Sequence, residues 1–288
     1  MHARFEKTLI FGVRPGGIGE ALGNQIQENG GRICGAVDKN DARLQNAKND
    51  RIPTHEMDFL EMDSAKIKSE IATVIQETQP KIIISTTGIA FVNRAGEMGG
   101  ENPIQELDDS FKMNTTVPAT IAQVAQEFGR ENNTKIPLVH LGSTLPHLGI
   151  DSTSVAYATS KAAAETLFQH FAPQGGVQII SAMIGYLVRT QMTEGLPRIN
   201  SDVMDSRDLP FSTRLKMQIL SRAVQTPDAI AAKILQKLNR ILEKENGQNV
   251  KFKIALPLPK WLIKMLFPIP NPSGEMVENF NKKAYGAE

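Results

Sequence analysis

The stretch Gly12-Val13-Arg14-Pro15-Gly16-Gly17-Ile18-Gly19 decides the fold because of what stands on either side of it. It follows the apolar run Thr8-Leu9-Ile10-Phe11, which predicts a buried strand, and it opens a predicted helix over residues 18–29. Glycines allow a sharp turn there and let backbone N–H groups approach a pyrophosphate at the positive end of the helix. A plain turn is the alternative, but the position after the first strand favours a dinucleotide site. The predicted contact residues are Gly12, Arg14, Gly17, Ile18 and Gly19.

An acidic residue follows the second predicted strand (residues 33–37). Asp38 lies 38 − 19 = 19 positions after Gly19, close to the ~20 expected of an acid that accepts from the adenosine ribose. A carboxylate there disfavours a 2′-phosphate, which places NAD(H) ahead of NADP(H), although Arg14 or Lys39 could meet such a phosphate. Asp38 also suits an ordinary turn. Asp58, after an apparent third strand, is either a further residue at the adenine end or a turn acid.

Short β-branched runs alternate with longer helical stretches along the rest of the chain. The later strands are predicted over 81–85, 136–141, 177–183 and 250–256, and the later helices over 63–78, 103–129, 155–171 and 227–245. This order predicts an α/β fold, a Rossmann-type doubly wound parallel sheet of about seven strands with helices on both faces. Ligands of such sheets bind at the carboxyl ends of the strands.

The composition excludes several classes of protein. The chain has 288 residues, 41% of them hydrophobic, with 32 basic side chains against 31 acidic ones. A disordered chain would be less apolar, and a net charge of +1 gives no reason to expect nucleic acid as a partner. We see no signal peptide at the N-terminus and no run of the ~20 apolar residues that a membrane span needs, so we expect a cytoplasmic protein.

The single cysteine and the histidines predict no metal site. Cys34 excludes an intrachain disulfide and a zinc site built from thiolates. It falls on a predicted buried strand beside the expected nucleotide site, where we expect an inert core thiol. His140 lies on the strand over 136–141 and is expected in the core rather than as a base.

Tyr157-Ala158-Thr159-Ser160-Lys161 carries the sharpest chemistry. The spacing i, i+4 puts the phenol and the ammonium on one helix face, and a nearby cation lowers the pKa of a phenol. Such a tyrosine could exchange a proton with a hydroxyl or a carbonyl. A surface tyrosine and a solvated lysine on an alanine-rich helix would be the ordinary alternative.

Several stretches together resemble the short-chain dehydrogenase/reductase family, over roughly residues 7–257. Tyr157 and Lys161 match its YxxxK pair, and Ser143, 157 − 143 = 14 residues before Tyr157, stands where the family keeps a serine, with Thr144 as a weaker candidate. The remaining matches are Asn114 in a helix, Ser85-Thr86-Thr87-Gly88 in place of NNAG, Ile184-Gly185, and Thr190. One residue is inserted between Gly12 and Gly17 relative to the family.

The resemblance implies an NAD(P)-dependent oxidoreductase that interconverts an alcohol and a carbonyl by hydride transfer. Tyr157 would be the general acid or base, Lys161 would lower its pKa and bind the nicotinamide ribose, and Ser143 would hold the substrate oxygen. Asn114 would support a water that relays protons to Lys161. The implied further nucleotide contacts are Thr87, Gly88, Gly185 and Thr190, beside Tyr157 and Lys161.

A non-catalytic nucleotide-binding regulatory or scaffold protein is the alternative, because a fold does not by itself imply a function. The intact set of Asn114, Ser143, Tyr157 and Lys161 favours the enzyme. A sugar-nucleotide epimerase is disfavoured, because such enzymes carry a larger C-terminal domain.

We expect one domain over residues 1–288. Residues 189–222 fall where the family forms its substrate lid, and their apolar content predicts an apolar or mixed carbonyl or alcohol substrate. The tail (257–288) and the basic, tryptophan-containing segment 256–268 could contact a membrane surface, but packing against the lid or another subunit is preferred. A homodimer or homotetramer is expected through the helix of Tyr157. The expected packed face consists of Ala162, Ala163, Ala164, Leu167 and Phe168.

Overall fold

The first strand and the first helix form where the sequence predicts them. β1 (Thr8–Phe11) is buried along its whole length, and α1 (Ile18–Glu28) begins directly after the glycine turn. These elements belong to a computed structural model of the chain. The structure describes residues 5–38, 54–89, 103–144, 155–171, 175–184, 225–244 and 247–254.

Within these residues, seven parallel strands form one sheet, as predicted. The strands are β1, β2 (Ile33–Asp38), β3 (Thr54–Glu56), β4 (Ile82–Ser85), β5 (Ile136–Ser143), β6 (Val177–Ile184) and β7 (Val250–Ile254). Their order in the sheet is β3-β2-β1-β4-β5-β6-β7. The chain therefore builds outward in one direction from β1 and in the other from β4, and ligands bind at the carboxyl ends beside such a reversal.

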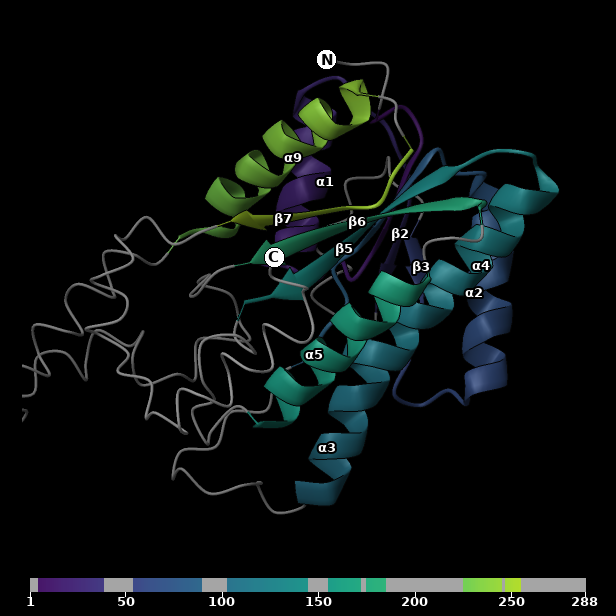
Figure 1. The fold of residues 1–288 in the computed structure, drawn as a ribbon, viewed down its shortest axis with the longest axis vertical. Coiled ribbons are helices and arrows are strands. Elements are labelled where there is room, and N and C mark those ends of the chain that lie inside the picture. Colours follow the sequence, from purple (N-terminus) through teal and green to yellow (C-terminus); the bar gives the residue numbers. More distant parts are fainter. Residues whose placement is uncertain are drawn as a thin grey trace, which may run out of the picture.

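Helices cover both faces of the sheet, again as predicted (Figure 1). The further helical segments are α2 (Ser64–Thr78), α3 (Pro103–Phe111), the π-helical turn η2 (Lys112–Thr116), α4 (Val117–Glu131), α5 (Val155–His170) and α9 (Pro227–Glu243). Figure 1 shows α1 and α9 on one face and α2, α4 and α5 on the other. Side chains alternate between the two cores along the inner strands, so Leu9 belongs to one and Ile10 to the other.

The helical stretch predicted over 103–129 is interrupted. Val117 N–H donates to the carbonyl of Lys112, five residues earlier, which is the bonding of a π-helix. Pro118 supplies the physical reason, because it has no N–H to offer to the carbonyl of Asn114 four residues before it. The widened turn holds Asn114 and Thr115, both of them buried.

The face of α5 that was expected to pack against another subunit is only partly exposed. Ala164 and Phe168 are buried in the core of the chain itself, so assigning them to an interface with another chain was wrong. Their spacing places them on the inner face of α5, beneath the helix and above the sheet. Leu167 is exposed, with 41% of its surface accessible.

Two glycines in helices offer a paired test of the packing. A Cβ on Gly129 of α4 would collide with the backbone of Gly176, whereas a Cβ on Gly23 of α1 would meet only the Ile10 Cδ1 atom at 3.6 Å. We expect Gly129→Ala to lower the free energy of unfolding by about 2 kcal/mol, because the backbone must move. Gly23→Ala should raise it by about 0.5 kcal/mol through helix preference. Urea unfolding of both variants checks this, and equal effects would contradict it.

Candidate active site

The site lies at the carboxyl ends of β1, β4 and β5, where α5 crosses above them. Phe11 and Ser85 pair at the ends of β1 and β4, and Ser143 ends β5. α5 carries Tyr157 and Lys161. Residues that are far apart in the sequence therefore meet at one edge of the sheet.

The glycine loop needs its glycines for space as well as for its turn. Gly12 has φ +89°, and a Cβ there would lie 2.8 Å from Thr86 Oγ1. A Cβ on Gly19 would lie 2.6 Å from the same oxygen. The start of α1 thus packs directly against the loop that follows β4.

Thr86 stabilises the contact between the glycine loop and the loop that follows β4. Its hydroxyl lies 2.6 Å from the carbonyl oxygen of Gly12 and 3.0 Å from that of Phe11, so its single proton is shared between these two acceptors. The Ser-Thr-Thr sequence that replaces the family's Asn-Asn-Ala therefore still hydrogen-bonds the backbone. Sequence reasoning did not single out Thr86, and its position between two motif residues was the available signal.

The glycine loop, which has one more residue than in the family, is held by hydrogen bonds within the chain. Gly17 N–H donates to the carbonyl of Arg14 at 2.9 Å, and Gly16 N–H donates to the carboxylate of Glu20 at 2.7 Å. Glu20 is the third residue of α1, where an acid commonly caps the helix start. Arg14 is exposed at the tip of the loop.

Asn114 is fully buried, and its side chain is bonded on both sides. Its Oδ1 accepts the Ile89 N–H at 2.8 Å, and its Nδ2 donates to the Ile89 carbonyl at 2.8 Å and to Ser160 Oγ at 2.9 Å. The carboxamide therefore joins the loop after β4 to α5.

Lys161 is buried beneath Tyr157, with 5% of its surface accessible. Its Nζ donates to the carbonyls of Leu141 at 3.2 Å and Thr87 at 3.3 Å. Burial lowers the pKa of Lys161 from 10.5 to about 8. A Cβ on Gly88 would come within 3.2 Å of this nitrogen, so the missing side chain of Gly88 leaves room for the Lys161 ammonium group.

Tyr157 is half-buried and hydrogen-bonded to Ser143. Burial raises the pKa of its phenol, and the hydrogen bond to Ser143 works in the opposite direction. The net shift of the Tyr157 pKa is therefore opposite to the lowering that was expected from Lys161. The lysine nitrogen lies 5.9 Å from the centre of the tyrosine ring and donates to backbone carbonyls, so desolvation of the phenolate prevails.

His140 is a core histidine, as expected. Only 2% of its surface is accessible, its ring centre lies 4.4 Å from that of Phe168, and neither ring nitrogen has a hydrogen-bond partner. Burial, followed by the charge of Lys161, holds the pKa of His140 well below 6.5. The imidazole is therefore neutral in the folded chain at neutral pH.

Replacing His140 by leucine should stabilise the protein, and more so in acid. The unfolded chain takes up a proton on this histidine below about pH 6.5 and the folded chain does not, so folding stability falls as pH falls. His140→Leu removes this pH-dependent decrease in the free energy of unfolding, which amounts to about 2 kcal/mol between pH 7 and pH 5. The substitution also removes two buried ring nitrogens that have no hydrogen-bond partner. Urea unfolding at pH 7 and pH 5 measures it. A pH dependence identical in both proteins would contradict it.

The structure describes some of the remaining predicted site residues and not others. Asp38 ends β2 at the carboxyl edge of the sheet, and Asp58 Oδ1 accepts the Leu60 N–H at 3.2 Å, which is the turn interpretation of that acid. Thr144 Oγ1 donates to the Ile184 carbonyl at 3.3 Å, and it is Ser143 that contacts Tyr157. Lys39, Gly185, Thr190, the lid and the tail lie outside the described residues.

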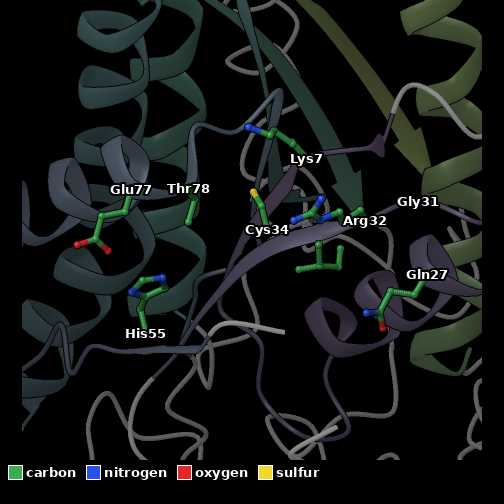
Figure 2. A pocket seen from close by; sticks show the side chains of 9 residues that line it. Lys7, Gln27, Gly31, Arg32, Cys34, His55, Glu77 and Thr78 are labelled. Atoms are coloured by element: carbon green, nitrogen blue, oxygen red, sulfur yellow. The ribbon is translucent and has the colours of Figure 1, made fainter. Parts of the chain in front are cut away.

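A hollow lies at the opposite, amino edge of the sheet (Figure 2). It has a volume of about 650 Å³, and its lining includes Lys7, Arg32, Cys34, His55 and Glu77. Figure 2 shows the sulfur of Cys34 on the side of Thr78, to which the thiol is hydrogen-bonded. Placing Cys34 beside the nucleotide site was therefore wrong, because it stands at the start of β2 and not at its end. Burial raises the pKa of this thiol, which fits an unreactive group.

The described residues contain no group of three or more His, Cys, Asp or Glu side chains arranged to hold a metal ion. Among the helices that the structure describes, none has the length and apolar character to span a membrane.

The observed cradle suits a dinucleotide. Gly12 and Gly19 bring the start of α1 close to Thr86, and Gly88 leaves room beside Lys161. The start of α1 offers N–H groups, and a buried cation lies at the other end of the site.

Comparison with known proteins identifies the family. A family model described as short chain dehydrogenase matches residues 7–199. No curated protein matches the chain.

Solved structures agree in fold. A short-chain dehydrogenase from Streptomyces avermitilis has 19% identity and a TM-score of 0.62, covering 98% of both chains. An actinorhodin polyketide ketoreductase solved with NADPH has 15% identity and a TM-score of 0.65, covering 90% of this chain and 100% of its own. The ligand-free aldohexose dehydrogenase of Thermoplasma acidophilum has 15% identity and a TM-score of 0.62, covering 88% and 97%. From the family match, this chain belongs to the short-chain dehydrogenase family, whose members are oxidoreductases that bind NAD(P)(H).

Proposed function

We propose that this protein interconverts an alcohol and a carbonyl compound, with Tyr157 exchanging the proton of the substrate oxygen. The observation that carries the proposal is the cluster of Tyr157, hydrogen-bonded Ser143 and buried Lys161 beside the glycine loop. No other cluster in the described residues joins an acid–base group to such a loop.

The nucleotide would be held along the carboxyl ends of β1, β2 and β4. The N–H groups of Ile18 and Gly19 at the start of α1 suit the pyrophosphate, whereas the N–H of Gly17 is already donated to the Arg14 carbonyl. Asp38 suits the adenosine ribose. Thr87 and Gly88 line the approach to Lys161. When bound, the nicotinamide supplies or accepts the hydride. We propose NAD(H) rather than NADP(H), on the acid that ends β2.

The proton chemistry follows from the environment of Tyr157. The raised pKa keeps its phenol protonated at neutral pH, and that form can donate to a carbonyl oxygen. Ser143 lies within hydrogen-bond reach of the same phenol, so the two hydroxyls can share one substrate oxygen. Lys161 places a positive charge beneath them, which favours the phenolate left after donation.

We further propose a single domain with an apolar or mixed substrate. The described elements form one sheet with cores on both of its faces, which supports one domain. The substrate class rests on the apolar residues of 189–222, and the homo-oligomer on the family resemblance.

Nucleotide binding followed by turnover tests the function. Titration with NADH and with NADPH, followed by absorbance, should show binding, tighter for NADH, and a panel of apolar carbonyls should then oxidise the bound cofactor. Binding without turnover of any carbonyl or alcohol would favour the non-catalytic scaffold. Absence of binding to either nucleotide would overturn both.

A further inference from the structure

Ser160, which precedes Lys161 on α5, is fully buried between three segments of the site. Its hydroxyl donates to the carbonyl of Tyr157 at 2.9 Å, and the same oxygen accepts from Asn114 Nδ2 at 2.9 Å. One small side chain thus joins the turn of α5 that carries Tyr157 to the side chain of Asn114.

The π-helical turn holds Ser160 at a second point. Thr115 Oγ1 donates to the backbone carbonyl of Ser160 at 2.7 Å. The neighbouring residues Asn114 and Thr115 therefore both contact Ser160, one at its hydroxyl and the other at its carbonyl. The bond from Asn114 fixes the orientation of a carboxamide whose other two bonds go to the backbone of Ile89.

The loop after β4 packs closely against Asn114. A Cβ on Gly88 would lie 3.0 Å from Asn114 Oδ1 and 3.2 Å from Lys161 Nζ, so the loop after β4 lies directly against both groups. Lys161 in turn donates to the carbonyl of Thr87, one residue earlier in this loop. A shift of the carboxamide would therefore move the loop and the acceptor of the lysine.

We infer that Ser160 is a positioning residue, whose hydroxyl holds Asn114 and the loop over 86–89 in register with Tyr157 and Lys161. Its side chain is fully buried and hydrogen-bonded to Tyr157 and Asn114, so it acts through Asn114. The inference rests on the proposed function for its effect on turnover, but the contact itself can be measured without turnover.

Kinetics of Ser160→Ala and Ser160→Cys test the effect on turnover. Alanine removes the hydroxyl, and cysteine keeps a side chain of similar shape but accepts hydrogen bonds weakly. Both should lower kcat about five- to tenfold, the equivalent of one lost hydrogen bond, while the Kd for nucleotide stays within about twofold. Thr166→Ala is the matched control, because its exposed hydroxyl also donates to a carbonyl of α5 and should leave kcat unchanged.

A double-mutant cycle separates positioning from loosened structure. If Ser160 acts through Asn114, Ser160→Ala should cost nothing further in kcat once Asn114→Ala is present. Full kcat in Ser160→Ala, or multiplied losses in the double variant, would overturn the inference.

Exchange of the Asn114 side-chain amide hydrogens gives a readout that needs no turnover. Nuclear magnetic resonance of protein labelled with ¹⁵N on asparagine should show these hydrogens protected in the wild type and in Thr166→Ala, but exposed to exchange in Ser160→Ala. Unchanged protection in Ser160→Ala would overturn the inference. If the wild type turns over no substrate, the proposed function fails, and the exchange data alone decide whether Ser160 holds Asn114.

Discussion

Replacement of Tyr157 by phenylalanine should lower kcat by about 10² to 10⁴-fold, the range expected when a general acid or base is removed. The variant keeps the ring over Lys161 but loses the hydroxyl that is hydrogen-bonded to Ser143. Because the glycine loop is untouched, the Kd for nucleotide should stay within about twofold.

Steady-state kinetics and a nucleotide titration on the same preparation measure both quantities. Tyr285→Phe provides a chemically matched control, since it removes a phenolic hydroxyl from the tail, and it should leave kcat unchanged. Full activity of Tyr157→Phe would remove Tyr157 from the mechanism. Loss of nucleotide binding together with turnover would show instead that the variant damages the fold.

Replacement of Lys161 by methionine should change how the free energy of unfolding depends on pH. The folded pKa is about 8 and the ordinary value is 10.5, so between these values the unfolded chain keeps a proton that the folded chain has released. Folding stability therefore rises with pH above about 8, by about 2 kcal/mol from pH 7 to pH 9.5 on account of this one group. The methionine variant lacks that increase.

Urea unfolding of wild type and Lys161→Met at pH 7 and pH 9.5 isolates the contribution, because other titrating groups act in both proteins. The upper pH stays below the range in which Tyr157, with its raised pKa, would begin to act in the opposite direction. Lys66→Met, at an exposed lysine of α2, should reproduce the wild-type difference. A parallel pH dependence in wild type and Lys161→Met would show that Lys161 is not desolvated. The same variant should also lower kcat, because no cation then lies beneath Tyr157.

The elements of the fold could be predicted from local sequence. The apolar run of β1, the glycine turn and the start of α1 depend on backbone periodicity and on residues a few positions apart. The spacing of Tyr157 and Lys161 is likewise local, since one turn of α5 places both on the same face. The π-helical turn was missed, although Pro118 was a visible signal that the hydrogen-bond pattern would break four residues earlier.

The details of the candidate site depended on contacts between distant residues. Asn114 is bonded to Ile89 and Ser160, which lie 25 and 46 positions away, and no local pattern specifies those partners. The direction in which the pKa of Tyr157 shifts depends on burial, which the spacing to Lys161 does not reveal. The burial of Phe168 inside its own subunit was hidden for the same reason.

The sequence alone therefore determined the order of strands and helices, the edge of the sheet at which the candidate site lies, and the family. These follow from periodicity, turn residues and short spacings, which act within a few residues along the chain. Only the tertiary structure decided that Ser160 and Thr86 form hydrogen bonds across the candidate site, that burial raises the pKa of Tyr157, and that Cys34 lies at the opposite edge of the sheet. Those properties follow from close packing and desolvation, which arise between segments that meet only when the sheet and its helices have assembled.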